Sequence, residues 1–117
     1  MLLTFMKAKI HRATVTQADL NYEGSITVDA ALLQESGILP NEQVHVYDCN
    51  NGSRFVTYAI EGAAHSGVIQ VNGAAARLVH PGDRLIIVAY AQGTPEELAK
   101  HTPRVLLMTQ DNQVKKA

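Results

Sequence analysis

The sequence has few of the features that assign a protein to a broad class at once. It contains a single cysteine, Cys49, which excludes an intrachain disulfide and fits a reducing compartment such as the cytoplasm. No apolar run approaches the roughly 20 residues that cross a membrane, and residues 1–13 are too short and too soon charged for a secretory signal. The formal net charge of −1 argues against a basic face for nucleic acid. We therefore expect a cytoplasmic protein with no nucleic-acid or membrane partner.

Motifs for metals and for phosphorylated cofactors are missing as well. None of the five histidines stands four residues from another, and one cysteine cannot form a Cys-x-x-Cys pair, so we expect no metal site. The sequence has neither a Walker motif nor GxGxxG, and hence no evident cradle for a phosphate such as that of pyridoxal phosphate.

The residues that are present predict one small, mainly β domain over residues 1–117, a length near the commonest domain size. Alternation, apolar runs and the Asn-Gly turn of NNGS predict strands in residues 7–16, 43–49, 54–60, 67–71, 84–90 and 104–109. Short helices are predicted in residues 29–37 and 94–101, and residues 72–78 could form a third helix of a single turn. We expect a small closed β-barrel with two or three short helices, because closure removes exposed strand edges.

Two details of this prediction concern the ends of the chain. In residues 7–16, strict alternation puts Lys7, Lys9, His11, Ala13 and Val15 on one face of the strand. The polar residues from about 110 to 117 are expected to form a flexible tail.

Four stretches occur in a specific order: KIHR (9–12), YEGSI (22–26), RFVTYAI (54–60) and NGAAA (72–76). Together they resemble the pyruvoyl-dependent aspartate 1-decarboxylases, which make β-alanine for pantothenate synthesis. The similarity covers nearly the whole chain and includes ILPNEQVHVYDCNNGSRF and HPGDRLIIVAY. The resemblance implies a double-psi β-barrel and a homotetramer whose active sites lie between subunits.

The resemblance also implies that the chain cleaves itself between Gly24 and Ser25. The Ser25 hydroxyl attacks the Gly24 carbonyl, and the resulting ester breaks down to leave a covalent pyruvoyl group in place of Ser25. A short β chain (1–24) and an α chain (25–117) result. Glycine leaves the carbonyl open to approach and permits a strained backbone, and Thr57 has the family's role of donating to the oxyanion. The need for a separate maturation factor stays open.

The charge of L-aspartate suggests roles for the other residues. The α-carboxylate leaves as CO2, so a clamp on the retained carboxylate is favoured. Arg54 offers bidentate donors and Lys9 a second positive charge, and both belong to the family's site. Tyr58 has the family's role of proton donor and shares a strand face with Arg54. The resemblance assigns further substrate contacts to Thr57, Gly73, Ala74 and Ala75, and a supporting role to His11, Tyr22, Asn72 and Tyr47, where many family members carry Trp.

Each of these residues also has an ordinary structural interpretation. Lys9 and His11 fit a solvated strand face, and Asn72-Gly73 fits a hairpin turn. Two other functions stay open: a β-barrel binding module of the same fold that never cleaves, and a pyruvoyl decarboxylase for another acidic amino acid. Intact mass separates the first alternative from the enzyme, and competition between aspartate and glutamate separates the second.

Overall fold

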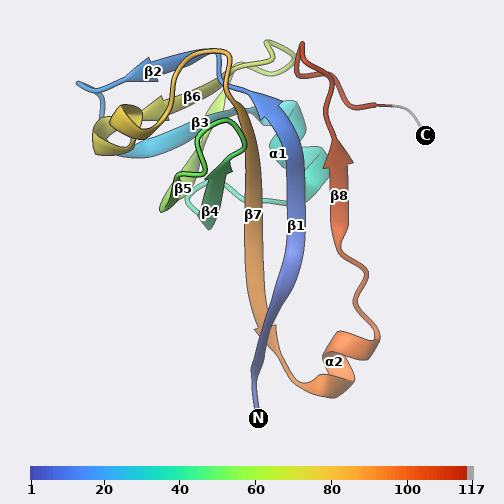
Figure 1. Cartoon of the computed structure of the whole chain (residues 1–117). Helices are drawn as coiled ribbons and strands as arrows, with labels where there is room; N and C mark the ends of the chain where they lie inside the picture. The colour runs from blue at the N-terminus through green and yellow to red at the C-terminus, as the bar shows by residue number, and fades with distance from the viewer. Residues whose placement is uncertain (116–117) are drawn as a thin grey trace.

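Strands dominate the computed structural model of the chain, which describes residues 1–115 (Figure 1). In chain order the elements are β1 (Leu3–Thr14), β2 (Gln17–Asp19), β3 (Ser25–Asp29), α1 (Ala30–Ser36), β4 (Gln43–Asp48), β5 (Arg54–Gly62), β6 (Ile69–Asn72), the 3-10 helix η1 (Gly73–Leu78), β7 (Arg84–Gly93), α2 (Pro95–Ala99) and β8 (Arg104–Leu107). The predicted mainly β fold with short helices is confirmed. Within the described residues, no helix has the length and apolarity needed to cross a bilayer.

One bent segment of chain closes the sheet into a barrel. The strands follow the order β2-β6-β3-β5-β4-β7-β1-β8. β1 pairs with β7 on one side, and β2 continues β1 after Val15 and Thr16 to pair with β6 at the other end of the order. The Thr16 backbone N–H strengthens this junction by donating to the Ile69 carbonyl at 2.8 Å. The strands therefore surround a single core, as the barrel prediction expected.

The core of the barrel consists of aliphatic side chains that alternate along the strands. Ile10, Ile26, Val46, Val71 and Ile87 are all fully buried. Burial of each such side chain contributes about 1.5–3 kcal/mol to stability. The residues between them along each strand face outward, and this outer face carries most of the charged and aromatic side chains predicted for the site.

A bulge in β1 reverses its alternation. The register with β7 shifts between His11 and Ala13, and Arg12 has a left-handed backbone with φ of 67°. The Arg84 guanidinium donates to the Arg12 carbonyl from Nε at 2.8 Å and from Nη2 at 2.6 Å. Ala13 and Val15 are buried in consequence. The prediction that they share a face with His11 is wrong, because the extra residue of the bulge turns them inward.

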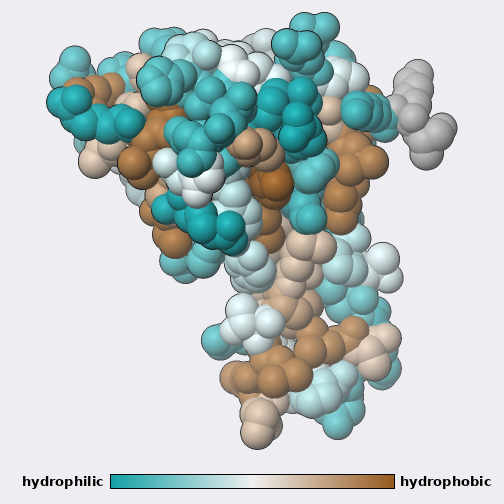
Figure 2. Space-filling view, in the orientation of Figure 1, coloured by the Kyte–Doolittle hydropathy of each residue, from teal (hydrophilic) through white to brown (hydrophobic). Residues whose placement is uncertain are grey.

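The outer halves of β1 and β7 extend beyond the barrel as a two-stranded arm with α2 at its end (Figure 1). Apolar surface is visible near the end of this arm in Figure 2, and Met1 and Leu2 are both exposed. A capping box starts α2, because the side chain of Thr94 accepts from the Glu97 N–H and the Glu97 carboxylate accepts from the Thr94 N–H. The predicted Thr94–Pro95 helix start is confirmed.

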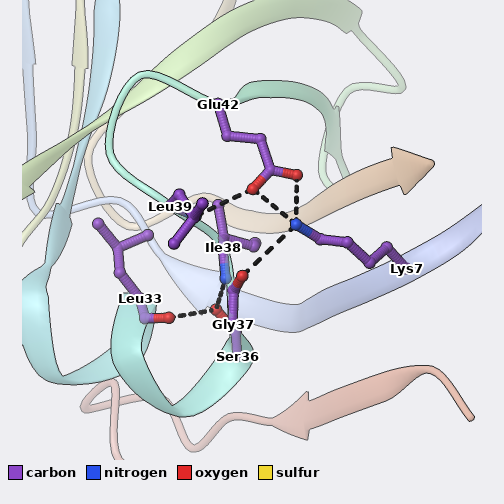
Figure 3. Close-up of polar contacts among 7 residues, drawn as sticks. All are labelled: Lys7, Leu33, Ser36, Gly37, Ile38, Leu39 and Glu42. Atoms are coloured by element: carbon purple, nitrogen blue, oxygen red, sulfur yellow. Dashed lines mark hydrogen bonds and ion pairs between the residues drawn. The ribbon is translucent and has the colours of Figure 1, made fainter.

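An ion pair joins β1 to the turn after α1 (Figure 3). Lys7 Nζ lies 2.6 Å from Glu42 Oε2 and also approaches the Gly37 carbonyl oxygen at 3.4 Å. Glu42 Oε1 in turn accepts from the Leu39 N–H at 2.9 Å. Because both side chains are largely shielded from solvent, this pair fixes the base of the arm against α1.

The last described residues lie against the barrel. Asn112 is 4% exposed, and its side chain accepts from the Thr14 N–H at 2.6 Å and donates to the carbonyls of Thr14 and Gly67, each at 2.8 Å. Met108 and Val114 form a further bridge. We predicted a flexible tail here, and in the structure this buried amide links residues 110–115 to the end of β1 and to the loop before β6. Residues 116–117 of the predicted tail lie outside the described residues.

Candidate active site

Ser25 is the first residue of β3, and its side chain is almost completely buried, with 1% exposed. Its hydroxyl donates to the Glu23 carbonyl at 3.0 Å and accepts from the Asn72 side-chain amide at 3.0 Å. The same Asn72 nitrogen donates to Thr27 Oγ1 at 3.0 Å, while Asn72 Oδ1 accepts from Gln70 Nε2 at 2.8 Å. Asn72 is therefore held from both ends, and it fixes the Ser25 oxygen in a dry environment beside the preceding peptide bond.

The segment before Ser25 rests on the first residue of η1. A Cβ built on Gly73 would lie 2.7 Å from the Gly24 Cα, whereas a Cβ built on Gly24 would meet nothing within 4 Å. The φ of Gly24 also lies outside the left-handed region. We expected Gly24 to be the glycine that makes room for the reaction. The structure instead places the close backbone contact at Gly73.

The neighbouring strand β5 brings two predicted residues to the level of this segment. β3 and β5 run parallel with Ile26 opposite Ala59. This register places Ser25 level with Tyr58, and its extension by one more residue places Gly24 level with Thr57. Neighbouring strands lie about 4.8 Å apart, so both residues lie one strand from the Gly24–Ser25 bond, with their side chains on opposite faces of β5.

Three predicted residues form a row across the outer face of the barrel. The register pairs Arg54 with Tyr47, Tyr47 with Ile86, and Ile86 with His11. Residues directly opposite each other on paired strands share a face. Lys9, two residues before His11, begins the next row on this face.

The Arg54 guanidinium is held in place by an aromatic ring. Its central carbon lies 4.0 Å from the centroid of Tyr47, a cation–π distance. The Tyr47 hydroxyl is 2.8 Å from that of Tyr90, and this hydrogen bond, together with burial, raises the pKa of Tyr90. Within residues 1–115 no carboxylate forms a salt bridge with Arg54. Arg54 therefore presents a fixed, exposed cation that is available to an anion.

His11 lies in a positive environment. Burial lowers the pKa of its imidazole, and the charges of Lys9, Arg12, Lys115 and Arg84 lower it further. His11 is thus held neutral near pH 7, and Nδ1 is a buried atom without a hydrogen-bond partner among the described residues. These charges favour an anion on this part of the outer face.

Sequence comparison decides the family. The family model described as aspartate decarboxylase matches residues 1–115. Curated relatives named aspartate 1-decarboxylase include that of Clostridium beijerinckii, 58% identical over 98% of this chain and 93% of the relative. Those of Caulobacter vibrioides and Desulfotalea psychrophila are 60% and 58% identical, over 100% and 98% of this chain and 99% and 97% of the relative. The chain belongs to the aspartate decarboxylase family.

Some of the predicted site residues meet within one chain and others do not. Ser25, Asn72, Gly73 and Tyr22 meet around the start of β3, since the Tyr22 carbonyl oxygen would lie 3.3 Å from a Cβ on Gly73. Ala74 and Ala75 follow in η1. Lys9 lies on the same outer face as Arg54, but β7 and β4 stand between its strand, β1, and the β5 strand of Arg54. Three strand spacings put the two backbones about 14 Å apart along the curved sheet.

A cavity of about 540 Å³ opens beside the aromatic cluster on β4 and β7. Tyr47 is the one predicted site residue in its lining, which comprises Thr4, Gln43, His45, Tyr47, Tyr90, Ala91 and Gln92. His45 and Tyr90 pack edge to face with ring centroids 4.9 Å apart. Sequence reasoning missed both, although His45 stands two residues before Tyr47 and so shares its strand face.

Sequence reasoning also missed the residues that hold Asn72. Gln70 and Thr27 both hydrogen-bond its side chain. The available signal was the spacing of two residues between Gln70 and Asn72, which puts both on one face of a strand. In the part of the chain that the structure describes, no group of three or more His, Cys, Asp and Glu side chains could hold a metal.

Proposed function

We propose that this family member is an aspartate 1-decarboxylase, which converts L-aspartate to β-alanine and CO2 and so supplies pantothenate and coenzyme A synthesis. The observation that carries the proposal is the buried Ser25 hydroxyl, fixed by Asn72 directly after Gly24. The names of the relatives support the same activity. The reaction belongs to the cytoplasm and uses neither a metal nor pyridoxal phosphate.

The cofactor is made from the chain itself. The Ser25 oxygen forms a bond to the Gly24 carbonyl carbon, the C–N bond breaks, and the hydroxyl proton ends on the Ser25 nitrogen, which leaves an ester. Loss of the Ser25 Cα proton and departure of the Gly24 carboxylate then leave dehydroalanine. Water replaces its nitrogen, ammonia departs, and a pyruvoyl group remains. The products are a β chain of residues 1–24 and an α chain of residues 25–117.

Two side chains assist this cleavage. Thr57, level with Gly24 on the adjacent strand, donates to the negative charge that develops on the Gly24 oxygen. Asn72 donates to one lone pair of the Ser25 oxygen while the Ser25 hydroxyl donates to the Glu23 carbonyl, so that the oxygen is held in a fixed orientation. Because the site is dry, these hydrogen bonds are stronger than they would be in water.

In substrate turnover, the pyruvoyl group supplies a carbonyl that accepts the electrons left by CO2. Arg54 and Lys9 bind the retained carboxylate through charge-assisted hydrogen bonds. Tyr58 delivers a proton to the α-carbon. The small residues Gly73, Ala74 and Ala75 expose backbone N–H groups to the substrate, while His11, Tyr22 and Tyr47 shape the pocket.

The distribution of these residues supports a site shared between chains. Lys9 and Ser25 lie on strands separated by β7, β4 and β5 in one direction around the barrel. In the other direction, the pairing of β2 with β6 begins only at Gln17, eight residues after Lys9. We infer that a homotetramer brings Lys9 and Arg54 of one subunit to the pyruvoyl group of a neighbour. A shared site of this kind also explains why the cavity beside Tyr47 contains so few of the predicted residues.

The test is an intact-mass spectrum of the purified, warmed protein, combined with an assay for β-alanine. We expect two fragments that divide after Gly24, the larger one carrying a pyruvoyl terminus, and turnover of aspartate in preference to glutamate. Ser25→Ala is the matched control and stays a single inactive chain, because no hydroxyl can attack. A wild-type chain that stays at full mass, also after incubation with cell extract to supply a maturation factor, would favour the binding module. Preference for glutamate would reject the proposed specificity.

A further inference from the structure

Gly73 and Gly24 face each other where the chain leaves the sheet. β3 and β6 pair antiparallel with Ser25 opposite Asn72, so Gly24 and Gly73 are the next pair beyond the ladder. A Cβ on Gly73 would lie 2.7 Å from the Gly24 Cα and 2.9 Å from the Gly24 nitrogen. Non-bonded carbon atoms prefer a separation of about 3.5–4.0 Å. Any side chain at position 73 therefore has to displace the segment that contains the scissile bond.

The backbone at Gly73 adds a second, independent demand for glycine. Its φ is 76°, in the left-handed region that other residues adopt only at a cost, and the residue is buried at the start of η1. Gly24 has neither constraint, because its φ is not left-handed and the space beside it is open. The close approach of the two segments thus depends on the missing side chain of Gly73.

We propose that Gly73 is a positioning residue for self-cleavage. Its bare backbone lets the Gly24 carbonyl lie at the depth where the Ser25 oxygen, fixed by Asn72, can reach the carbonyl carbon. This inference rests on the proposed function, since it assigns Gly73 a part in the same cleavage. The step itself forms the C–O bond, breaks the C–N bond and moves the hydroxyl proton to the Ser25 nitrogen.

A side chain at position 73 displaces the Gly24 carbonyl and leaves the Ser25 oxygen in place. It pushes the Gly24 backbone outward, while the Asn72 amide still holds the Ser25 oxygen from the paired strand. Reaction rates depend steeply on such alignment, and a misplacement of about 1 Å can cost about 100-fold. Gly73→Ala should therefore cleave about 100-fold more slowly than the wild type.

The experiment follows the fraction of cleaved chain over time by intact mass, with circular dichroism and thermal melting to check the fold. Gly52→Ala is the matched control, because Gly52 has an almost identical φ of 77° but nothing within 4 Å of an added Cβ. We expect Gly52→Ala to cleave at the wild-type rate. Gly73→Asn separates the two demands, since asparagine tolerates the left-handed region but still carries a Cβ. We expect it to fold better than Gly73→Ala and to cleave equally slowly.

Three results would overturn the inference. They are cleavage of Gly73→Ala at the wild-type rate, recovery of cleavage in Gly73→Asn, and failure of both variants to fold while Gly52→Ala folds. The last result would make Gly73 a residue needed for folding. A wild-type chain that does not cleave would instead reject the proposed function, and the same time course reveals it.

Discussion

At the scale of single residues, Arg54 has surroundings that suit the binding of a carboxylate. Its guanidinium is exposed, is stacked 4.0 Å from the centre of the Tyr47 ring and forms no salt bridge within residues 1–115. A cation held in a fixed orientation loses little conformational freedom when it binds a carboxylate. The stacking also gives Tyr47 a definite role, which a tryptophan at this position would supply with a larger ring.

Arg54→Ala should therefore separate cofactor formation from substrate binding. Cleavage at Gly24–Ser25 should proceed as in the wild type, whereas kcat/KM for aspartate should fall by about 100-fold, because charge-assisted hydrogen bonds contribute about 1.5–3 kcal/mol. Intact mass measures the first effect, and β-alanine formation measures the second. Arg54→Lys keeps the charge but not the planar fork of the guanidinium. Its kcat/KM should therefore lie between those of the wild type and Arg54→Ala. Unchanged turnover in Arg54→Ala would remove this residue from the site.

The orientation of a side chain could be predicted where neighbouring residues in the sequence determine it. It could not be predicted where contacts with a distant segment determine it. Lys9 and Ile10 face opposite sides of β1 because alternation is a property of any strand. The bulge at Arg12 depends on Arg84, which is distant in the sequence, so strict alternation failed beyond it. The close contact of Gly73 is likewise made with another segment, and no local pattern signals it.

At the scale of elements, Asp29 joins three pieces of chain. As the predicted N-cap of α1, it accepts from the Ala31 N–H at 2.8 Å. It also accepts from the His65 and Gly67 N–H groups, each at 2.9 Å, and so anchors the loop between β5 and β6. The sequence predicted the cap, because Asp before a helix is a local signal. The loop contacts depend on the folded arrangement of β3 against that loop.

Asp29→Asn should destabilise the fold in a pH-dependent manner. Burial alone would raise the pKa of Asp29, but the N–H donors of Gly67, His65 and Ala31 together bring it below the ordinary value. A carboxylate with a lowered folded-state pKa contributes stability above its unfolded pKa of about 3.9, and this contribution is lost as the pH falls through the folded pKa.

We therefore expect Asp29→Asn to lower the free energy of unfolding by about 1–3 kcal/mol at pH 7, since an amide offers one good acceptor oxygen instead of two. The difference from the wild type should shrink under acid conditions, where the wild-type carboxyl is protonated as well. Urea unfolding at pH 7 and in acid measures the difference in the free energy of unfolding at each pH. Both chains can carry Ser25→Ala, so that each is compared in its uncleaved form. A difference that stays constant with pH would contradict the role of the charge.

At the scale of the whole molecule, the path of β1 and β2 explains both the closure of the barrel and the distance between Lys9 and the site residues of β5 within one chain. The segment β1–β2 pairs with β7 at one end of the strand order and with β6 at the other. This arrangement surrounds one core, but it places Lys9 on the far side of β7 and β4 from β5. Local alternation could predict which residues face outward. It could not predict which outward faces meet, because under the proposed function a second chain supplies the other half of the site.

Complementation between two inactive variants tests this shared site directly. Lys9→Ala should cleave and form its pyruvoyl group but turn over aspartate poorly, whereas Ser25→Ala keeps Lys9 and has no pyruvoyl group.

If the site lies between subunits, mixed oligomers contain sites that combine the pyruvoyl group of one variant with Lys9 of the other. For random assembly at equal amounts, about a quarter of the sites are complete, because each of the two contributions is correct half of the time. Co-expression of differently tagged chains, followed by purification on both tags, should thus restore slightly more than a quarter of wild-type β-alanine formation per site, because the purification removes oligomers that contain one variant only. If Lys9 instead serves the Ser25 of its own chain, no mixed oligomer contains a complete site, and activity stays at the level of the separate variants.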